Sequence, residues 1–366
     1  MVPIILTLDY EICGNGSGDT MRDIVQPTTR LLDLCDKHNA KLTIMFEVGE
    51  YLAFAKYDEQ LQADLAYSPH EQMRRQATNA VLRGHDVQLH LHPQWLTAHY
   101  ENGVWQFHHS RWRLADMSAG PGREHKVASI AHALDTGKST LENMLQPVKE
   151  DYECFCFRAG SFCAQPSRDI IIAMKRVGLK ADSSVVRGYR AGAPLAVDYS
   201  QVETDAAAWW TTETELTAEG APGENVLELS VSSRMVPYWK SFKPAKLRAI
   251  AKMRRIENAS RENHSGAENV SSLPSRREVL RRLLRKRPSP LDFCKLSARD
   301  MLNRVKEHTK TTQQPIVAIG HSKDFVNEGE FENFLTGLGQ EKSVRCYNMS
   351  DYVREILPCV AGSQVA

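Results

Sequence analysis

The chain has no long apolar run and no excess of charge of either sign. None of its hydrophobic stretches approaches the ~20 residues that a membrane-spanning helix needs, and no basic segment followed by an apolar stretch precedes the first predicted strand. The 46 basic and 45 acidic side chains leave a formal net charge of +1, which gives no overall attraction to nucleic acid or to an anionic membrane. We therefore expect a cytoplasmic protein, with peripheral attachment to the inner membrane face as the alternative.

The eight cysteines include no C-x-x-C pair, the spacing typical of structural zinc sites and redox motifs. Cys154 and Cys156 are too close in sequence for an ordinary disulfide. In a reducing compartment, scattered cysteines are mostly small buried hydrophobic residues. We expect neither a disulfide framework nor a cysteine metal site.

Strand patterns and helix patterns alternate along the chain. Strands are predicted at 4–8, 41–46, 86–92, 155–158, 180–183, 226–231 and 315–320, and helices at 27–39, 68–83 and 166–177. This alternation predicts an α/β fold with a mainly parallel sheet and right-handed crossovers, most simply a barrel. A length of 366 residues suggests two domains by the usual prior. Because barrels of this size are often single domains, we predict one barrel over residues 1–366 that carries an insertion at 232–300.

His90 and His92 form a His-x-His pair at the end of the strand predicted at 86–92. Residues two apart in a strand point to the same face, so both imidazoles project together, about 7 Å apart at the backbone. That separation lets two rings converge on one divalent metal. Pro93 cannot donate to a strand ladder and should end the strand there. The alternative is a pair of hydrogen-bonded polar residues at a strand end.

Asp9 and Glu11 repeat this pattern at the end of the first predicted strand. Their carboxylates share a face, and ionised groups at the end of a buried strand need partners or a metal. A surface turn is the alternative, because the glycine-rich loop 14–19 follows. That loop lacks the spacing of a dinucleotide fingerprint, and the two carboxylates precede it where a phosphate would bind, so nucleotide binding is not expected.

Polar residues end the later strands as well. Active groups of parallel barrels gather at the carboxyl ends of the strands. The sequence therefore predicts one site, to which seven residues contribute: Asp9, Glu11, His90, His92, Arg158, Asp182 and His321.

Five short motifs in this order resemble those of the polysaccharide deacetylase family, the NodB-like metal-dependent deacetylases. The family motif T-F-D-D is similar to L-T-L-D-Y-E at 6–11, and G-H-E-(x)3-H-T is similar to G-H-D-V-Q-L-H-L at 84–91. The motif R-P-P-Y is similar to F-R-A-G-S-F at 157–162, a later aspartate motif to A-D-S-S at 181–184, and L-x-L-x-H to V-A-I-G-H at 317–321. The resemblance covers residues 4–325 discontinuously and implies a distorted (β/α) barrel.

The chain also departs from the family pattern. Tyr10 stands where the family has its second aspartate, and Glu11 is the nearest replacement. Gln94 stands where the second histidine is expected, so His92 must substitute for it. The prolines and the tyrosine of R-P-P-Y are missing. The resemblance is therefore to a divergent branch, of the kind found in bacterial surface-polysaccharide gene clusters.

The resemblance implies a role for each site residue. Glu11, His90 and His92 would hold a divalent metal, with zinc expected. Asp9 would be the general base and His321 the general acid, while Arg158 would orient Asp9 and Asp182 would be the carboxylate beside His321. Each has a structural alternative: a salt bridge for Arg158, a turn or cap for Asp182, and a core histidine for His321. His85 and His99 are near the site in sequence, and either could be a further ligand. The family pattern does not usually use the histidine at position 85, and neither residue is assigned to the site.

Residues 234–299 are strongly basic, with basic side chains outnumbering acidic ones about three to one. A capping box at 68–71 marks the start of the helix predicted at 68–83. In the basic segment, a second capping box at 275–278 and the residues 246–255 predict helices that flank a polar linker. The simplest interpretation is a solvated helical insertion that covers one barrel end. A more specific interpretation is that the segment contacts an anionic membrane surface, a lipid-linked precursor or a phosphate-bearing saccharide. Nucleic acid is not expected, because no recognisable binding module is present.

The predicted function is a metal-dependent hydrolase that removes an N-acyl group, such as acetyl, from a sugar or saccharide precursor. Two alternatives remain. One is a metal-dependent glycosidase on a similar barrel, with Asp9 or Glu11 as the nucleophile. The other is a catalytically degenerate carbohydrate-binding protein, in which the missing aspartate and histidine are real losses.

Overall fold

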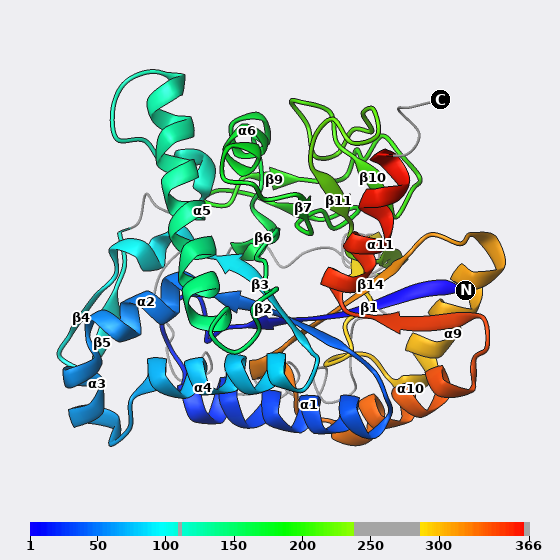
Figure 1. Cartoon of the computed structure of the whole chain (residues 1–366), viewed down its shortest axis with the longest axis horizontal. Coiled ribbons are helices and arrows are strands. Elements are labelled where there is room, and N and C mark those ends of the chain that lie inside the picture. Colours follow the sequence, from blue (N-terminus) through cyan, green and yellow to red (C-terminus); the bar gives the residue numbers. More distant parts are fainter. Residues whose placement is uncertain (109–111, 238–285, 362–366) are drawn as a thin grey trace, which may run out of the picture. The chain divides into compact units, whose positions relative to one another are not determined.

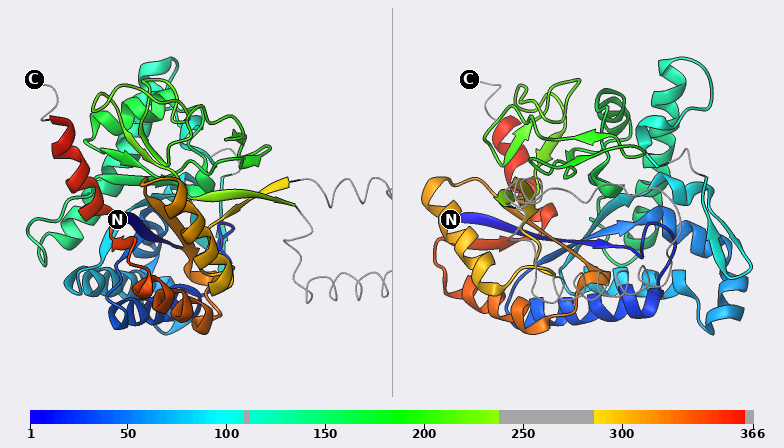
Figure 2. Two further views of the ribbon diagram at one scale, coloured as in Figure 1. Left: turned by 90° about the vertical axis from the view of Figure 1, so that its right-hand side faces the viewer. Right: turned by 180° about the vertical axis from the view of Figure 1, so that it is seen from behind.

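The computed structural model describes residues 1–108, 112–237 and 286–361, which fall into two compact units. The first unit comprises residues 1–232 and 290–366, and the second comprises 233–289. In the second unit, β12 (Ser233–Pro237) and β13 (Lys286–Pro290) form a two-stranded sheet, so these flanks of the predicted helical insertion are strands. The helices predicted between 246 and 285, and the membrane or saccharide contact expected of them, lie outside the described residues (Figure 2).

A nine-stranded sheet forms the centre of the first unit, in the order β10-β11-β7-β6-β3-β2-β1-β14, with β15 also paired to β1. Its strands are β1 (Val2–Tyr10), β2 (Leu42–Glu47), β3 (Asp86–Leu91), β6 (Cys156–Ala159), β7 (Ala181–Asp182), β10 (Ala208–Trp210), β11 (Leu227–Leu229), β14 (Ile316–His321) and β15 (Val344–Tyr347). Every pairing is parallel except that of β10 with β11. Val231, two residues beyond β11, bridges Val186, which follows β7, and Val317 of β14, so the chain beyond β11 pairs with the last strand of the order. The predicted α/β class and distorted barrel are confirmed.

The helices pack outside this sheet and against one another. Figure 1 shows α1, α4 and α10 on one side of the sheet and α5 and α6 on the other. Contacts run from α9 to α10, from α10 to α1, and from α4 through α5 to α6. The helices are α1 (Gln26–Lys37), α2 (Val48–Lys56), α3 (Asp58–Leu65), α4 (Pro69–Leu82), α5 (Arg123–Leu145), α6 (Arg168–Arg176), α9 (Ala298–Thr311), α10 (Glu328–Gln340) and α11 (Met349–Ala361). Among the described residues, no helix combines the length and the apolar character needed to cross a membrane.

The short elements lie between these strands and helices. Two hairpins are formed by β4 (His99–Glu101) with β5 (Val104–Gln106) and by β8 (Arg190–Ala191) with β9 (Val197–Asp198). Short helical turns are η1 (Thr20–Val25), η2 (Pro93–Thr97), η3 (Leu114–Asp116), η4 (Gly160–Phe162) and η6 (Ser322–Asp324). The turns η4 and η6 directly follow the carboxyl ends of β6 and β14, and η2 follows β3 after one residue, His92.

Local signals in the sequence account for several helix ends. The Ser68 hydroxyl accepts a hydrogen bond from the Glu71 backbone N–H and caps α4, as the capping box predicted. Gly84 and Gly178 follow α4 and α6 with φ of +78° and +76°, the left-handed conformation that glycine adopts without strain. The helix α6 begins at Arg168, two residues later than predicted.

Alternation along β1 divides its side chains between two environments. Ile4, Leu6 and Leu8 belong to the large apolar core between sheet and helices, whereas Ile5 belongs to a second apolar cluster on the other face. Tyr10 continues the first series and stacks on Phe46 with ring centroids 5.2 Å apart. Side chains at odd positions of β1 therefore share the inner face, which is apolar near the amino end of the strand and ends in Asp9 and Glu11.

Candidate metal centre

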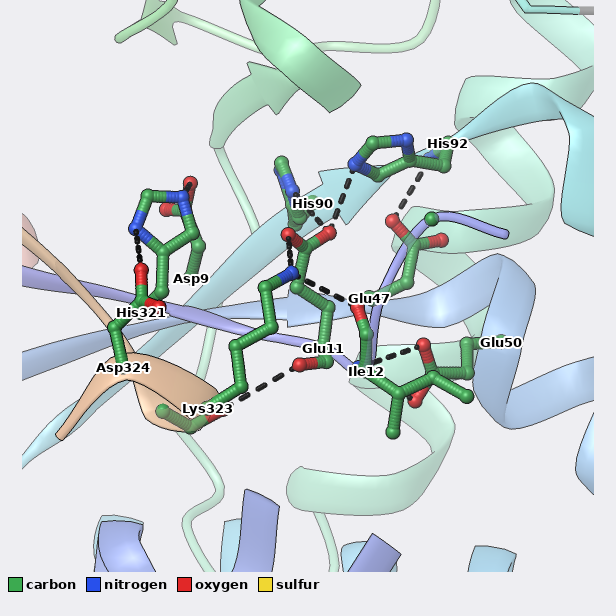
Figure 3. A network of polar contacts seen from close by, with 12 residues as sticks. Asp9, Glu11, Ile12, Glu47, Glu50, His90, His92, His321, Lys323 and Asp324 are labelled. Atoms are coloured by element: carbon green, nitrogen blue, oxygen red, sulfur yellow. Dashed lines mark hydrogen bonds and ion pairs between the residues drawn. The ribbon is translucent and has the colours of Figure 1, made fainter. Parts of the chain in front are cut away.

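Four buried side chains converge at the carboxyl ends of three adjacent strands. Glu11 follows β1, Glu47 ends β2, His90 belongs to β3 and His92 follows it. One ligand atom from each residue lies within 4.8 Å of the others (Figure 3). The parallel register pairs Glu47 with His90 and so fixes these two at the same level. Carboxylate oxygens and imidazole nitrogens are ordinary ligands of zinc and similar ions, so this group can hold a divalent metal.

The orientation of His90 fits a metal ligand. Its Nδ1 lies 2.9 Å from the Arg158 backbone carbonyl, which can only accept, so Nδ1 carries a hydrogen. Its buried Nε2 points at Glu11 Oε2, 3.3 Å away, without the geometry of a hydrogen bond. Fixing the outer nitrogen of a ligating histidine in this way directs the other nitrogen at the metal. The residues present therefore fit a metal ion at this position.

His92 lies beside Glu11 and His90, and two neighbours explain how it reaches this place. Its Nε2 lies 2.8 Å from Glu11 Oε2, and its ring centroid lies 5.1 Å from that of His90. Gln94, at the position of the missing family histidine, places Nε2 3.2 Å from Nδ1 of His92. Gly160 provides the space for the ring, because a Cβ there would lie 2.4 to 2.6 Å from its atoms. The expected substitution of His92 for the missing histidine is therefore geometrically feasible.

The sequence analysis missed Glu47. It follows directly after the strand predicted at 41–46, and the rule that polar residues at strand ends form the site applies to it as well. One carboxylate oxygen accepts the backbone N–H of His92 at 2.8 Å, and the other accepts that of Gly49 at 2.9 Å. Glu47 can therefore position the His92 backbone or supply a fourth ligand.

Burial and charge oppose each other in this cluster. Burial raises the pKa of Glu11, but His92 and His90 outweigh it and hold that pKa well below its usual value. Burial raises the pKa of Glu47, whose neighbouring histidines offset this only in part. Burial lowers the pKa of His90, but the carboxylates of Asp9 and Glu11 raise it to about 9. At neutral pH the metal-free cluster thus carries a proton that a metal ion would displace.

A second group lies beside the cluster, centred on Asp9. Arg158 is fully buried and donates from Nη1 to Asp9 Oδ1 at 2.6 Å, while His321 Nε2 lies 3.5 Å from Asp9 Oδ2. Arg158 also donates to the Ser183 carbonyl and hydroxyl at 2.8 and 2.9 Å. Burial alone would raise the pKa of Asp9, but the charges of Arg158, His90 and His321 leave it below its ordinary value. Asp9 is therefore ionised at neutral pH and held in one orientation.

The prediction that Asp182 pairs with His321 needs correction. The carboxylates nearest to His321 are Asp9 and Asp324, the latter 4.0 Å from Nδ1. Asp182 instead accepts both the backbone N–H and the hydroxyl of Ser184, at 2.9 and 2.8 Å. Its carboxylate is satisfied by a residue two positions along the chain, which is the local hydrogen bonding typical of aspartate in turns.

Asp182 has another carboxyl group as its neighbour. The parallel register of β7 with β11 places Glu228 directly opposite Asp182. Both are fully buried, and Glu228 Oε2 has no hydrogen-bond partner among the described residues. Burial raises the pKa of Asp182 to about 7, and burial together with Asp182 raises the pKa of Glu228 well above its usual value. The pair therefore holds at least one proton at neutral pH.

Because these pKa values are higher in the folded than in the unfolded chain, the stability that the pair contributes is present at low pH and is lost as pH rises through the folded values. We expect the free energy of unfolding to fall by about 1.4 kcal/mol per pH unit for each proton that the folded chain still holds and the unfolded chain has released, starting near the ordinary carboxyl pKa of about 4 and continuing to the folded values. Glu228→Gln removes one titrating group and should flatten this slope in urea melts at pH values between the ordinary carboxyl pKa and the pKa of about 7 of Asp182. An unchanged slope in the variant would contradict the assignment.

His85 and His99 are not among the residues of this cluster. His85 accepts the Leu42 N–H at Nδ1 and contacts Asp36 through Nε2 at 2.9 Å. His99 Nδ1 lies 3.0 Å from the Tyr57 hydroxyl. Both have structural partners that account for their positions.

No protein-family model and no curated protein sequence matches this chain. Solved structures are similar to it. An inferred polysaccharide deacetylase from Mycobacterium smegmatis is 11% identical with a TM-score of 0.45, covering 100% of this chain and 91% of that one. The 4-alpha-glucanotransferase from Thermococcus litoralis is 10% identical with a TM-score of 0.49, over 97% of this chain and 40% of that one. Puue allantoinase is 11% identical with a TM-score of 0.42, over 96% and 89%. These similarities concern the fold, and the proposals below depend on this chain's own side chains.

Proposed function

We propose that this protein is a metal-dependent hydrolase that removes an N-acyl group, acetyl in the simplest case, from a sugar or saccharide precursor. The observation that carries the proposal is that two groups adjoin: the buried cluster of Glu11, His90 and His92, and the Arg158–Asp9–His321 series, to which His90 Nδ1 is joined through the Arg158 backbone carbonyl. A divalent metal, for which we propose zinc, supplies Lewis acidity that lowers the pKa of water and polarises a carbonyl.

The chain's own residues supply the proton transfers that amide hydrolysis requires. Asp9 is ionised and accepts a proton from the attacking water, while Arg158 fixes the carboxylate in place. His321 retains 20% of its side-chain surface, and its imidazole donates a proton to the departing amine. The 3.5 Å between Asp9 Oδ2 and His321 Nε2 places base and acid side by side. Such a base and acid suit acyl transfer to water.

Metal analysis of the purified protein tests the centre. We expect about one divalent ion per chain in the wild type and a loss of metal affinity of at least ~10- to 100-fold in His90→Ala and in His92→Ala, the range seen even for residues that only support a ligand. His99→Ala is the matched control, since this exposed histidine contacts Tyr57 and should leave the affinity unchanged. Retention of full metal affinity by both site variants would show that the centre lies elsewhere.

Product analysis tests the reaction. The wild type should release acetate from N-acetylated sugars without forming new reducing ends. Release of reducing sugar without acetate would instead identify a glycosidase. Binding of saccharide by a protein that carries no metal and releases neither product would identify the degenerate binding protein.

A further inference from the structure

We infer that Lys323 is a positioning residue for Glu11 that leaves a single carboxylate oxygen of Glu11 for the metal. This inference rests on the proposed function. The two oxygens of Glu11 have different partners: Oε1 lies 2.7 Å from Lys323 Nζ, while Oε2 lies 2.8 Å from His92 and 3.3 Å from His90 (Figure 3). Oε1 is therefore occupied on the side facing away from the histidines.

The sheet register explains why a lysine reaches this position. Asp9 of β1 is paired with His321 of β14 in a parallel ladder. Glu11 lies two residues after Asp9, and Lys323 lies two residues after His321. The spacing D-x-E in one segment and H-x-K in its neighbour therefore produces two contacts, Asp9 with His321 and Glu11 with Lys323. Their adjacency depends on a pairing between segments about 310 residues apart in sequence.

Lys323 also fixes the backbone that carries Glu11. Its Nζ donates to the Ile12 carbonyl at 2.9 Å, and the Ile12 N–H donates to the Glu50 carboxylate at 3.1 Å (Figure 3). Residue 12 is therefore held from both its N–H and its C=O. Because Ile12 directly follows Glu11, these two bonds restrict the backbone from which the Glu11 side chain projects.

The charge of Lys323 has a further effect. Lys323 retains 20% and Glu11 9% of its side-chain surface, so the pair is largely shielded from water. A buried ammonium needs an anionic partner, and here that partner is a candidate metal ligand. Hydrogen bonds from supporting residues orient ligating carboxylates, and their removal lowers metal affinity by about 10- to 100-fold. Lys323 is placed to act in this way on Glu11.

The test compares zinc affinity in Lys323→Met, Lys323→Arg and the wild type, by competition with a chromogenic chelator. We expect Lys323→Met to bind zinc about 10- to 100-fold more weakly. Lys323→Arg, which keeps the charge and the donors, should recover most of the affinity. Lys180→Met is the matched control, because Lys180 makes an ion pair of the same 2.7 Å length with Glu153 on an exposed surface; its affinity should equal that of the wild type.

Thermal melts of the metal-free proteins separate positioning from a purely structural role. A Lys323→Met variant with wild-type zinc affinity, whatever its melting temperature, would overturn the inference while the proposed function stands. Failure of the wild type itself to bind zinc, or any other divalent metal, would overturn the proposed function and this inference with it. Lost affinity in Lys323→Met with recovery in Lys323→Arg would support both.

Discussion

Asp9→Asn is expected to lower kcat by about 10²- to 10⁴-fold, the range for loss of a general base, while the metal is retained. The amide cannot accept the proton from water, but its oxygen can still receive the hydrogen bond from Arg158 that Asp9 Oδ1 now accepts. Asp9 is not one of the four residues of the metal cluster, so metal content should remain close to that of the wild type. Steady-state kinetics and metal analysis on the same preparation measure both quantities.

The same substitution should lower the free energy of unfolding by about 3 to 5 kcal/mol, because it leaves the buried Arg158 guanidinium without its charge partner. Asp169→Asn is the matched control. Asp169 forms an ion pair of the same 2.6 Å length with Arg123 at the surface, where such pairs contribute about 0 to 1 kcal/mol. Urea unfolding should separate the two variants clearly. Wild-type kcat in Asp9→Asn would exclude Asp9 as the base.

Much of the fold and the centre of the site could be predicted because they depend on local patterns. A buried strand alternates its side chains, and parallel strands bring their carboxyl ends to one edge, so Asp9, His90 and Arg158 could be assigned to one site from spacing alone. The same rule applied to the strand at 41–46 would have included Glu47. Glu47 was therefore predictable from its position at a strand end.

Other features depend on information that local sequence does not carry. Lys323 lies in a turn beyond β14, and its contact with Glu11 follows from the register between two distant strands. Asp182 was assigned to the correct edge but to the wrong partner, because competition from the adjacent Ser184 is decided by side-chain geometry. No local pattern predicted α11. Its Ser350 donates to the buried Asp86 at the opposite end of the barrel.

Gly160→Ala is expected to weaken metal binding at least tenfold, an effect comparable to loss of a residue that orients a ligand. The added Cβ would lie 2.4 to 2.6 Å from three atoms of the His92 ring, so the ring must leave its present position beside Glu11. Gly160 does not have a positive φ, so an alanine is compatible with its backbone and the effect is one of space. Overpacking of this kind also costs about 1 to 3 kcal/mol of stability. Gly192→Ala, at a glycine with open space around it, is the control.

A double-mutant cycle assigns the effect to His92. With the ring removed in His92→Ala, the additional Gly160→Ala change has nothing to displace and should not weaken metal binding further. Equal losses in both backgrounds would show that Gly160 acts through another contact. The His92 ring can therefore occupy its place beside Glu11 only where residue 160 leaves room for it.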